Sequence, residues 1–334
     1  MSVSESRYTV LDRAPRRIRD VLLRWDVILV IMLALVIIIN TIFSPYFLDM
    51  FNLADATFNF SEKALIALPM ALLILVRDID LSVAAIVALA AMAIGYAANA
   101  GAGPVVLFAV GLSVGLACGL FNGFLVTVAG LPSIVVTIGT MSLFRGLAQV
   151  ILGDQALTKF PENFTVLGQS YIIKFPPTAL SFLIFLGLAL LFGLYLHKTA
   201  GGRRLFAMGS NPVAARFSGI PVNRIRFALF AVTGLMAGLA AALLTARLGS
   251  MRSNIAIGWE LDIITMVILG GVSIAGGVGS ILGVVLAVFV LGLITFGMSL
   301  NNIPGIVISV WMGLLLVLSL AAPIIARRFL NRSG

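Results

Sequence analysis

Long uninterrupted apolar runs constrain the fold of this chain more than any other feature of its sequence. A helix needs about 17–25 apolar residues to cross the hydrocarbon core of a membrane, and several runs reach that length. Hydrophobic residues make up 61% of the chain and charged residues 10%, far from the balance of soluble domains. A membrane β-barrel would show short alternating segments instead, so the runs predict an all-α, polytopic integral membrane bundle. The runs are Val27–Phe43, Pro104–Val128, Thr178–Leu196, Phe227–Leu244, Ser280–Phe296 and Ile306–Ala326.

Lysine and arginine residues gather at both ends of the chain and in one internal segment. Six of the 22 precede Val27, six lie within residues 198–227, and three follow Ala326. Positive residues mark the cytoplasmic side of membrane proteins, so the net charge of +9 indicates membrane topology rather than nucleic-acid binding. We expect a basic cytoplasmic N-terminus (1–26), one transmembrane domain (27–326) with a cytoplasmic loop at 198–227, and a basic cytoplasmic C-terminus (327–334).

The number of membrane crossings follows from placing all three basic clusters in the cytoplasm. Six candidate spans precede Lys198 and four follow it, so about ten helices would leave both termini inside. The first span is interpreted as a retained helix, because no small-residue cleavage site of a signal peptide follows it. The candidates are Val27–Phe43, Ala64–Val76, Ser82–Asn99, Pro104–Val128, Ser133–Leu152, Thr178–Leu196, Phe227–Gly249, Leu261–Ala275, Ser280–Gly297 and Ile306–Ala326.

Two of these candidates, Ala64–Val76 and Leu261–Ala275, are short for a full crossing and lie beside acidic residues. Short, interrupted apolar segments are typical of the broken helices of transporters, so broken or re-entrant helices are expected at both places. The segments Thr57–Lys63, Gly153–Pro177 and Ser250–Glu260 are expected to face outward.

Glycines recur at the spacing that lets membrane helices approach closely. Overlapping G-x-x-x-G units are followed by two further pairs. Small residues at this spacing mark a helix–helix contact, either inside the bundle or at a dimer face. The glycines are Gly115, Gly119, Gly123, Gly234, Gly238, Gly279 and Gly283.

Polar residues within the apolar part are costly, at about 2.5–3.5 kcal/mol per charge, and are therefore candidates for function. In the segment 77–82, Asp80 is expected to cap the following helix and Asp78 to pair with Arg77, unless this break lines a polar transport path. Arg145 would either extend to the interface or pair with Asp80, Asp262 or Glu260 in the bundle. The path candidates are Asp80, Ser82, Asn122 and Arg145, and the possible helix-end or gating acids are Asp78, Glu260 and Asp262.

The sequence carries no chemistry for an energy source of its own. None of its four lysines follows a glycine, so the phosphate-binding G-x-x-x-x-G-K-[ST] motif is absent. A single histidine, His197, and a single cysteine, Cys118, exclude an internal disulfide and argue against a metal site or a catalytic triad. We therefore expect neither an enzyme nor a cofactor on this chain, and another chain would supply the energy for uphill transport.

The internal basic segment, Lys198 to Phe227, contains a short predicted helix. Asn211 is a favoured N-cap, Pro212 suits the first helical position and Gly219 suits the position after the C-cap. Val213 and Phe217 are four residues apart and share one face. The segment is either a docking site for another protein or an ordinary cytoplasmic loop folded against its own bundle.

Gly202–Ile220 resembles the cytoplasmic loop of permease subunits of bacterial ABC sugar importers of the ribose/xylose type. Ile79–Val83, Asn122–Ala148 and Glu260–Gly283 resemble the same family, in the same order. The resemblance implies a location in the bacterial inner membrane, an ABC ATPase carrying ATP and Mg on the cytoplasmic side, a periplasmic sugar-binding protein, and a second permease copy or a sister subunit. It implies that the following residues meet the ATPase: Asn211, Pro212, Val213, Ala214, Ala215, Arg216, Phe217 and Gly219.

The chain departs from that family around Ile79–Val83. The family has Gly-Gly before this motif and Gly-Ser after it, whereas this chain has Arg77-Asp78 and Ala84-Ala85. A basic–polar pair resembles the rhamnose and autoinducer-2 branch, so rhamnose or a similar deoxyhexose is the first expectation. Autoinducer 2 and branched-chain amino acids remain alternatives, as do a proton-coupled transporter using Asp78 or Asp80 and a membrane scaffold that binds lipid or a cytosolic protein.

Overall fold

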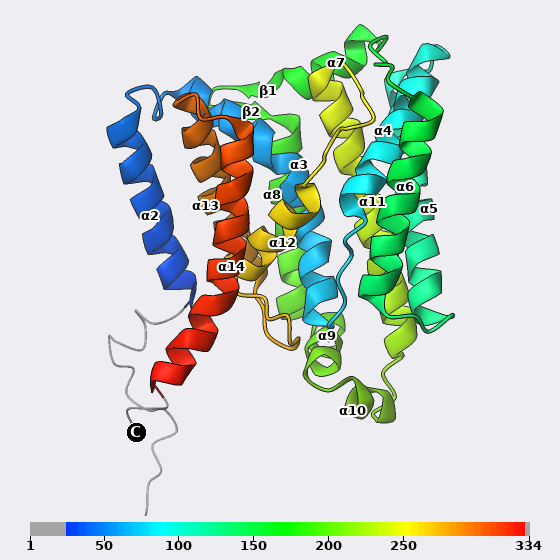
Figure 1. The fold of residues 1–334 in the computed structure, drawn as a ribbon, viewed down its shortest axis with the longest axis vertical. Helices are drawn as coiled ribbons and strands as arrows, with labels where there is room; N and C mark the ends of the chain where they lie inside the picture. Colours follow the sequence, from blue (N-terminus) through cyan, green and yellow to red (C-terminus); the bar gives the residue numbers. More distant parts are fainter. Residues whose placement is uncertain (1–24, 331–334) are drawn as a thin grey trace, which may run out of the picture.

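The computed structural model describes residues 25–330 as a bundle of helices, several of which run from one end of the molecule to the other (Figure 1). Among the described residues, seven helices are long and apolar enough to cross a membrane, namely α2, α3, α5, α6, α8, α11 and α13. The count of ten spans stays a prediction. The long helices are α2 (Trp25–Phe43), α3 (Met50–Leu75), α5 (Pro104–Thr127), α6 (Ser133–Leu152), α8 (Leu180–Lys198), α11 (Val222–Leu248), α13 (Ile281–Leu300) and α14 (Gly305–Leu330).

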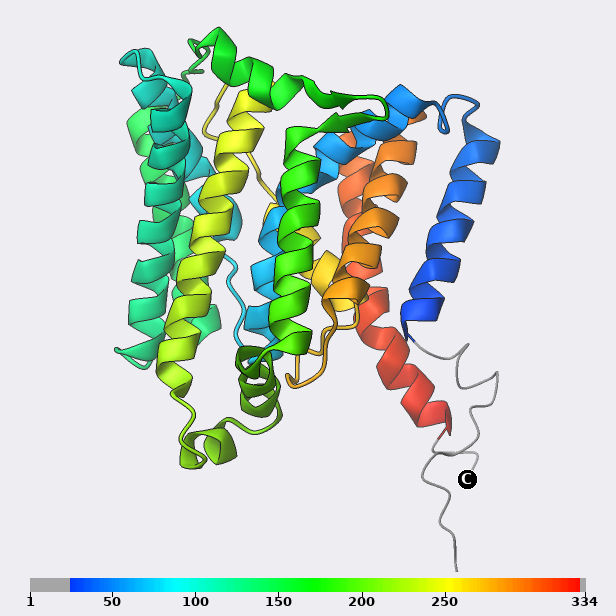
Figure 2. The same cartoon turned by 180° about the vertical axis from the view of Figure 1, so that it is seen from behind.

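Short elements mark the two ends of the bundle (Figures 1 and 2). One end carries α7 (Glu162–Gln169) and a two-stranded antiparallel β-ribbon, a small departure from the all-α prediction. The strands of this ribbon are β1 (Tyr171–Lys174) and β2 (Pro177–Ala179), and we call this end the ribbon end. The opposite end, the α10 end, carries α9 (Ala200–Ser210) and α10 (Pro212–Phe217).

The start of α2 and the end of α14 also lie toward the α10 end. The basic ends predicted for residues 1–26 and 327–334 fall largely outside the described residues, and the cytoplasmic placement of the termini stays a prediction.

Helix α3 forms the centre of the bundle and is longer than its apolar run predicted. Thr57–Lys63 continue the helix instead of forming a loop, whereas their placement on the outer side stays a prediction. Asp49 begins α3 by accepting hydrogen bonds from the backbone N–H groups of residues 51 and 52. Polar side chains inside α3 bond within the helix, as when Thr57 donates to the Ala54 carbonyl at 2.6 Å, so they do not interrupt it.

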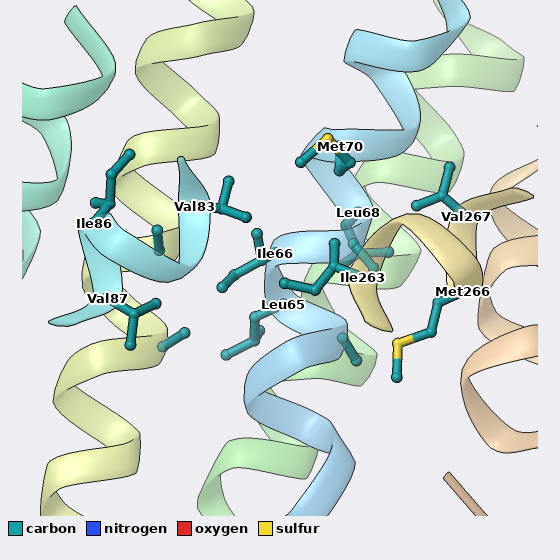
Figure 3. Close-up of a cluster of buried hydrophobic side chains, with 14 of the residues drawn as sticks. Leu65, Ile66, Leu68, Met70, Val83, Ile86, Val87, Ile263, Met266 and Val267 are labelled. Carbon is teal, nitrogen blue, oxygen red and sulfur yellow. The ribbon is translucent and has the colours of Figure 1, made fainter. Parts of the chain in front are cut away.

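Two shorter helices pack beside α3 and bury its apolar residues (Figure 3). They are α4 (Val83–Asn99) and α12 (Trp259–Leu269). Leu65, Ile66 and Leu68 of α3 lie between side chains of α4 and side chains of α12. All of these side chains belong to one buried cluster, so the three elements share a common core.

Both α4 and α12 follow a break in the bundle (Figure 1). After α3 reaches the α10 end, residues 77–82 return along it and α4 begins at about mid-height. After α11 reaches the ribbon end, residues 249–258 descend along the bundle and α12 also begins at about mid-height. The short helix predicted at Leu261–Ala275 is confirmed by α12, whereas Ser250–Glu260 enters the bundle instead of forming an outward loop.

The glycine spacing marks a contact inside the bundle. A Cβ atom added to Gly115 of α5 would lie 2.3 Å from the carbonyl oxygen of Gly234 on α11, and one on Gly238 would lie 2.2 Å from that of Gly111. The two backbones therefore touch, as small residues at this spacing allow. Gly283 makes a similar approach to Gly270, so internal packing explains both sets of glycines.

Replacing Gly115 with valine is expected to separate α5 from α11 and to lower the stability of the bundle by about 1–3 kcal/mol or more, since overpacking forces backbone shifts. The matched control is Gly187→Val on α8, where an added Cβ has nothing within 4 Å. Thermal unfolding in detergent measures both. Equal melting temperatures for the two variants would contradict the assigned contact.

Candidate functional site

Three fully buried polar residues meet where residues 77–82 lead into α4. The backbone N–H and the hydroxyl of Ser82 donate to Asp80 Oδ1 at 2.9 and 2.6 Å. Asn122 on α5 donates from Nδ2 to Ser82 Oγ at 2.8 Å and to Asp80 Oδ2 at 3.4 Å. All three are path candidates from the sequence, and the structure brings them together. We call them the Asp80 cluster.

The cluster differs in one respect from the sequence prediction. Ser82, not Asp80, is the N-cap residue of α4, and its side chain makes no capping bond. Asp80 instead shapes the turn that precedes the helix. Asn122 Oδ1 is a buried acceptor without a hydrogen-bond partner among the described residues. A buried acceptor of this kind is costly unless water or a solute supplies a donor.

Arg145 of α6 joins the two breaks in the bundle. Its guanidinium donates from Nη1 to the carbonyl oxygens of Ser253 and Ile255, at 3.1 and 2.6 Å, and from Nη2 to that of Ala84 at 3.2 Å. The side chain therefore points into the bundle rather than extending to the interface. Its hydrogen bonds go to backbone carbonyls, which lack helical partners in the breaks, while Glu260, one of the acids considered as a partner, acts on the guanidinium through its charge.

Asp78 forms an ion pair that the sequence did not predict. Arg226 of α11 donates to both carboxylate oxygens of Asp78, from Nε at 2.5 Å and from Nη2 at 2.6 Å. Arg77, the expected partner, turns away and donates to the carbonyl oxygens of Gly209 and Ser210 at 2.7 and 2.8 Å. Arg226 lies in the basic segment, where its charge had been assigned to topology alone.

Two further ion pairs hold α3 to its neighbours. Lys63 donates to Asp262 at the start of α12 at 2.6 Å and lies 5.4 Å from the centre of the Trp259 ring. Glu62 accepts from Arg247 of α11 at 2.7 Å. The sequence alone did not identify Glu62, Lys63 and Arg247. If Thr57–Lys63 is taken as helical, Glu62 and Lys63 become charged residues inside a membrane helix, and such residues need partners of opposite charge.

Glu260 also lies in the first turn of α12, where the helix dipole favours an acid. This agrees with the predicted helix-end position of Glu260 and Asp262. Among residues 25–330, no group of three metal-ligating side chains comes together.

A cavity of about 280 Å³ lies near the ribbon end, away from the Asp80 cluster. It is lined by Asp55, Phe58, Asn59, Gln169 and Arg247. The Tyr171 hydroxyl donates to Asp55 at 2.5 Å. Burial, with the hydrogen bond and charge of Asp55, raises the pKa of Tyr171 to about 12, so this donor stays protonated at neutral pH.

Helix α10 has the capped geometry that its sequence predicts. Asn211 Oδ1 accepts from the backbone N–H groups of Val213 and Ala214 at 3.1 and 3.0 Å. Gly219 has a φ of 81°, in the left-handed region that glycine tolerates. The side chains of Val213 and Phe217 are 64% and 89% exposed, so an apolar pair projects from the α10 end.

Comparisons with known proteins identify the class. A family described as the permease component of branched-chain amino acid transport systems matches residues 52–320. The autoinducer 2 import system permease protein LsrD of Escherichia coli (strain K12) is 35% identical over 299 residues, covering 88% of this chain and 90% of that protein. The protein of that name from Shigella flexneri has the same identity and coverage, and the one from Escherichia coli O157:H7 is 34% identical. No solved structure matches.

The chain therefore belongs to this family of permeases. It is a multi-pass membrane protein of a bacterial import system, in agreement with an inner-membrane location and with the resemblance to ABC sugar-importer permeases. Permeases are transport subunits rather than enzymes. Membership in an ABC import system implies an ATPase and a periplasmic binding protein as partners.

Replacing Arg145 with glutamine is expected to release residues 249–258, because at least two backbone carbonyls lose their donor at about 1–3 kcal/mol each. Hydrogen exchange of this segment should become faster. The matched control is Arg252→Gln, which changes an exposed arginine of the same segment. Unchanged exchange in Arg145→Gln would show that the segment is held by other contacts.

Proposed function

We propose that this chain is the transmembrane subunit of an ATP-driven importer for a small polyhydroxylated solute, with autoinducer 2 as the first candidate. The curated relatives are named as autoinducer 2 permeases, which supports this order. Rhamnose, or a similar deoxyhexose, is the second candidate on the basis of Arg77-Asp78 before Ile79–Val83. A branched-chain amino acid, which is not polyhydroxylated, is the alternative to this class of solute and comes from the description of the family.

The observation that carries the proposal is the geometry of α10. A six-residue helix has little stability of its own, yet this one is capped at both ends and presents Val213 and Phe217 to solvent. Exposed apolar side chains on a rigid, capped turn are typical of a docking site. We assign α10 and its flanks, Asn211 to Gly219, to contact with a separate ATPase.

The translocation path is proposed to pass the Asp80 cluster and Arg145. Hydroxyl and amide groups of the cluster match the hydrogen-bonding groups of a polyhydroxylated solute. Helices α4 and α12 both begin at mid-height beside these groups (Figure 1). Half-helices that start within the bundle are a recurrent way of building a solute site in transporters. A second permease, identical or a sister chain, would complete the path.

Replacing Phe217 with aspartate is expected to abolish co-purification of the ATPase, because a charge would replace the exposed apolar side chain at the contact. Affinity purification in mild detergent with mass spectrometry measures this. The matched control is Phe175→Asp, the same change at a phenylalanine that is 80% exposed beside β1. If no ATPase accompanies the unaltered chain, the importer proposal fails and the scaffold or proton-coupled alternative replaces it.

Asn122→Leu is expected to lower solute uptake on the order of tenfold, since it removes one donor and one free acceptor from the Asp80 cluster. Binding of the ATPase should be unchanged. The measurement is the rate at which cells remove autoinducer 2, or rhamnose, from the medium. The cells lack their own copy of the chain and carry either the unaltered chain or Asn122→Leu. A protonophore added at constant ATP separates the proton-coupled alternative, which predicts that uptake collapses.

A further inference from the structure

The chain on both sides of α10 is held by two consecutive residues. Arg77 donates to the carbonyl oxygens of Gly209 and Ser210, the two residues that precede the N-cap of α10. Asp78 binds Arg226, which lies beyond α10 in the first part of α11. The two contacts therefore grip the incoming and the outgoing chain of the same short helix. We call Arg77, Asp78 and Arg226 the anchor.

The backbone around the anchor is closely packed at three glycines. The N–H of Gly277, in the loop between α12 and α13, donates to the carbonyl oxygen of Leu75 at 2.9 Å. A Cβ atom added to Gly209 would lie 2.0 Å from that same oxygen, and one added to Gly276 would lie 2.5 Å from Cγ of Arg77. The end of α3, the end of α9 and this loop thus form one contact. This close packing leaves little room for α9 to shift without moving the end of α3.

Arg77 also has an unusual backbone conformation. Its φ of 72° lies in the left-handed region, which residues with a Cβ seldom adopt. Glycine would fit this backbone without strain, but glycine has no side chain to reach the two carbonyl oxygens. The strained backbone aims the guanidinium at the chain entering α10, and persistent strain of this kind points to a functional contact.

The anchor is continuous with the Asp80 cluster. Asp80 follows Asp78 by two residues, and the backbone carbonyl between them, that of Ile79, accepts from Thr137 of α6 at 3.3 Å. Arg77 is in the left-handed region and residues 81 and 82 form a turn, so only residues 78–80 lie between the two. The α10 end is therefore linked to the buried polar cluster by a backbone segment of a few residues.

We infer that Arg77, Asp78 and Arg226 are coupling residues that transmit displacement of α10 to the Asp80 cluster and so open or close the path. This inference rests on the proposed function. The bidentate pair between Arg226 and Asp78 suits the role, since two parallel charge-assisted hydrogen bonds resist both rotation and separation. The residues position the cluster and do not themselves contact the solute.

The test is a comparison of uptake and ATP hydrolysis in the same preparation of the full importer, reconstituted in liposomes. Arg77→Gly keeps the left-handed backbone and removes both donors. We expect assembly with the ATPase and hydrolysis of ATP to persist, while the solute transported per ATP falls about 5- to 150-fold, the range of ordinary coupling between sites. The matched control is Arg224→Gln, an exposed arginine two residues before Arg226 on α11.

The ion pair is tested by reversal. Asp78→Arg and Arg226→Asp should each uncouple transport from hydrolysis, and the double variant should restore part of the ratio. Hydrogen exchange gives a second readout that does not depend on uptake. Trapping the ATPase with ATP and vanadate should alter exchange in both 209–219 and 77–82 in the unaltered importer, but only in 209–219 in Arg77→Gly.

The outcomes separate this inference from the proposed function. If uptake and hydrolysis fall together, or fall only with the melting temperature, Arg77 and Asp78 merely stabilise the fold and the inference is wrong. The inference is also wrong if Arg77→Gly transports with an unchanged ratio while the unaltered importer is coupled. If the unaltered chain binds no ATPase, the proposed function fails first.

Discussion

Non-helical backbone inside a membrane bundle must find its hydrogen-bond partners within the protein, and much of this structure follows from that requirement. The breaks at 77–82 and 249–258 expose carbonyl groups that no helix satisfies. Arg145 supplies donors to three carbonyls in and beside the breaks, and Thr137 supplies one to Ile79. The position of an arginine within α6 is thus explained mainly by the carbonyl groups that it binds, and the charge of Glu260 acts on it as well. Its removal would take hydrogen-bond donors away from both breaks.

The same requirement explains which parts of the fold the sequence predicted. Helices α5, α6 and α8 begin and end within two residues of their apolar runs, because in lipid the length of a run sets the length of the helix. The capped helix α10 was predicted equally well from Asn211 and Gly219, whose effects are local. The full length of helix α3 was not predicted, because the polar residues at Thr57–Lys63 suggest a loop. Only the structure shows that these residues bond within the helix and to α11 and α12.

Part of the candidate site was likewise predicted from the sequence, and part was not. Asp80, Ser82 and Asn122 were identified one by one, since each is a polar residue at a depth where polar groups are costly. Their partners depend on which helices meet, as in the pair between Asp78 and Arg226, which are 148 positions apart. A neighbouring arginine is the natural guess for Asp78 from sequence alone. The left-handed backbone at Arg77, which directs that side chain elsewhere, has no signature in the residue itself.

Two aspartates two residues apart therefore have different surroundings, and the difference indicates what each can do. Asp78 faces the full charge of Arg226 through two short hydrogen bonds, and losing Arg226 would leave the buried Asp78 carboxylate without its ion-pair partner. Asp80 is bound only by neutral hydroxyl, amide and backbone donors. On the proposed path, a solute with hydroxyl groups could replace such donors one for one at little electrostatic cost, but it could not replace a guanidinium. Asp78 is thus suited to hold the chain in place, and Asp80 is suited to the proposed role of exchanging partners with a solute.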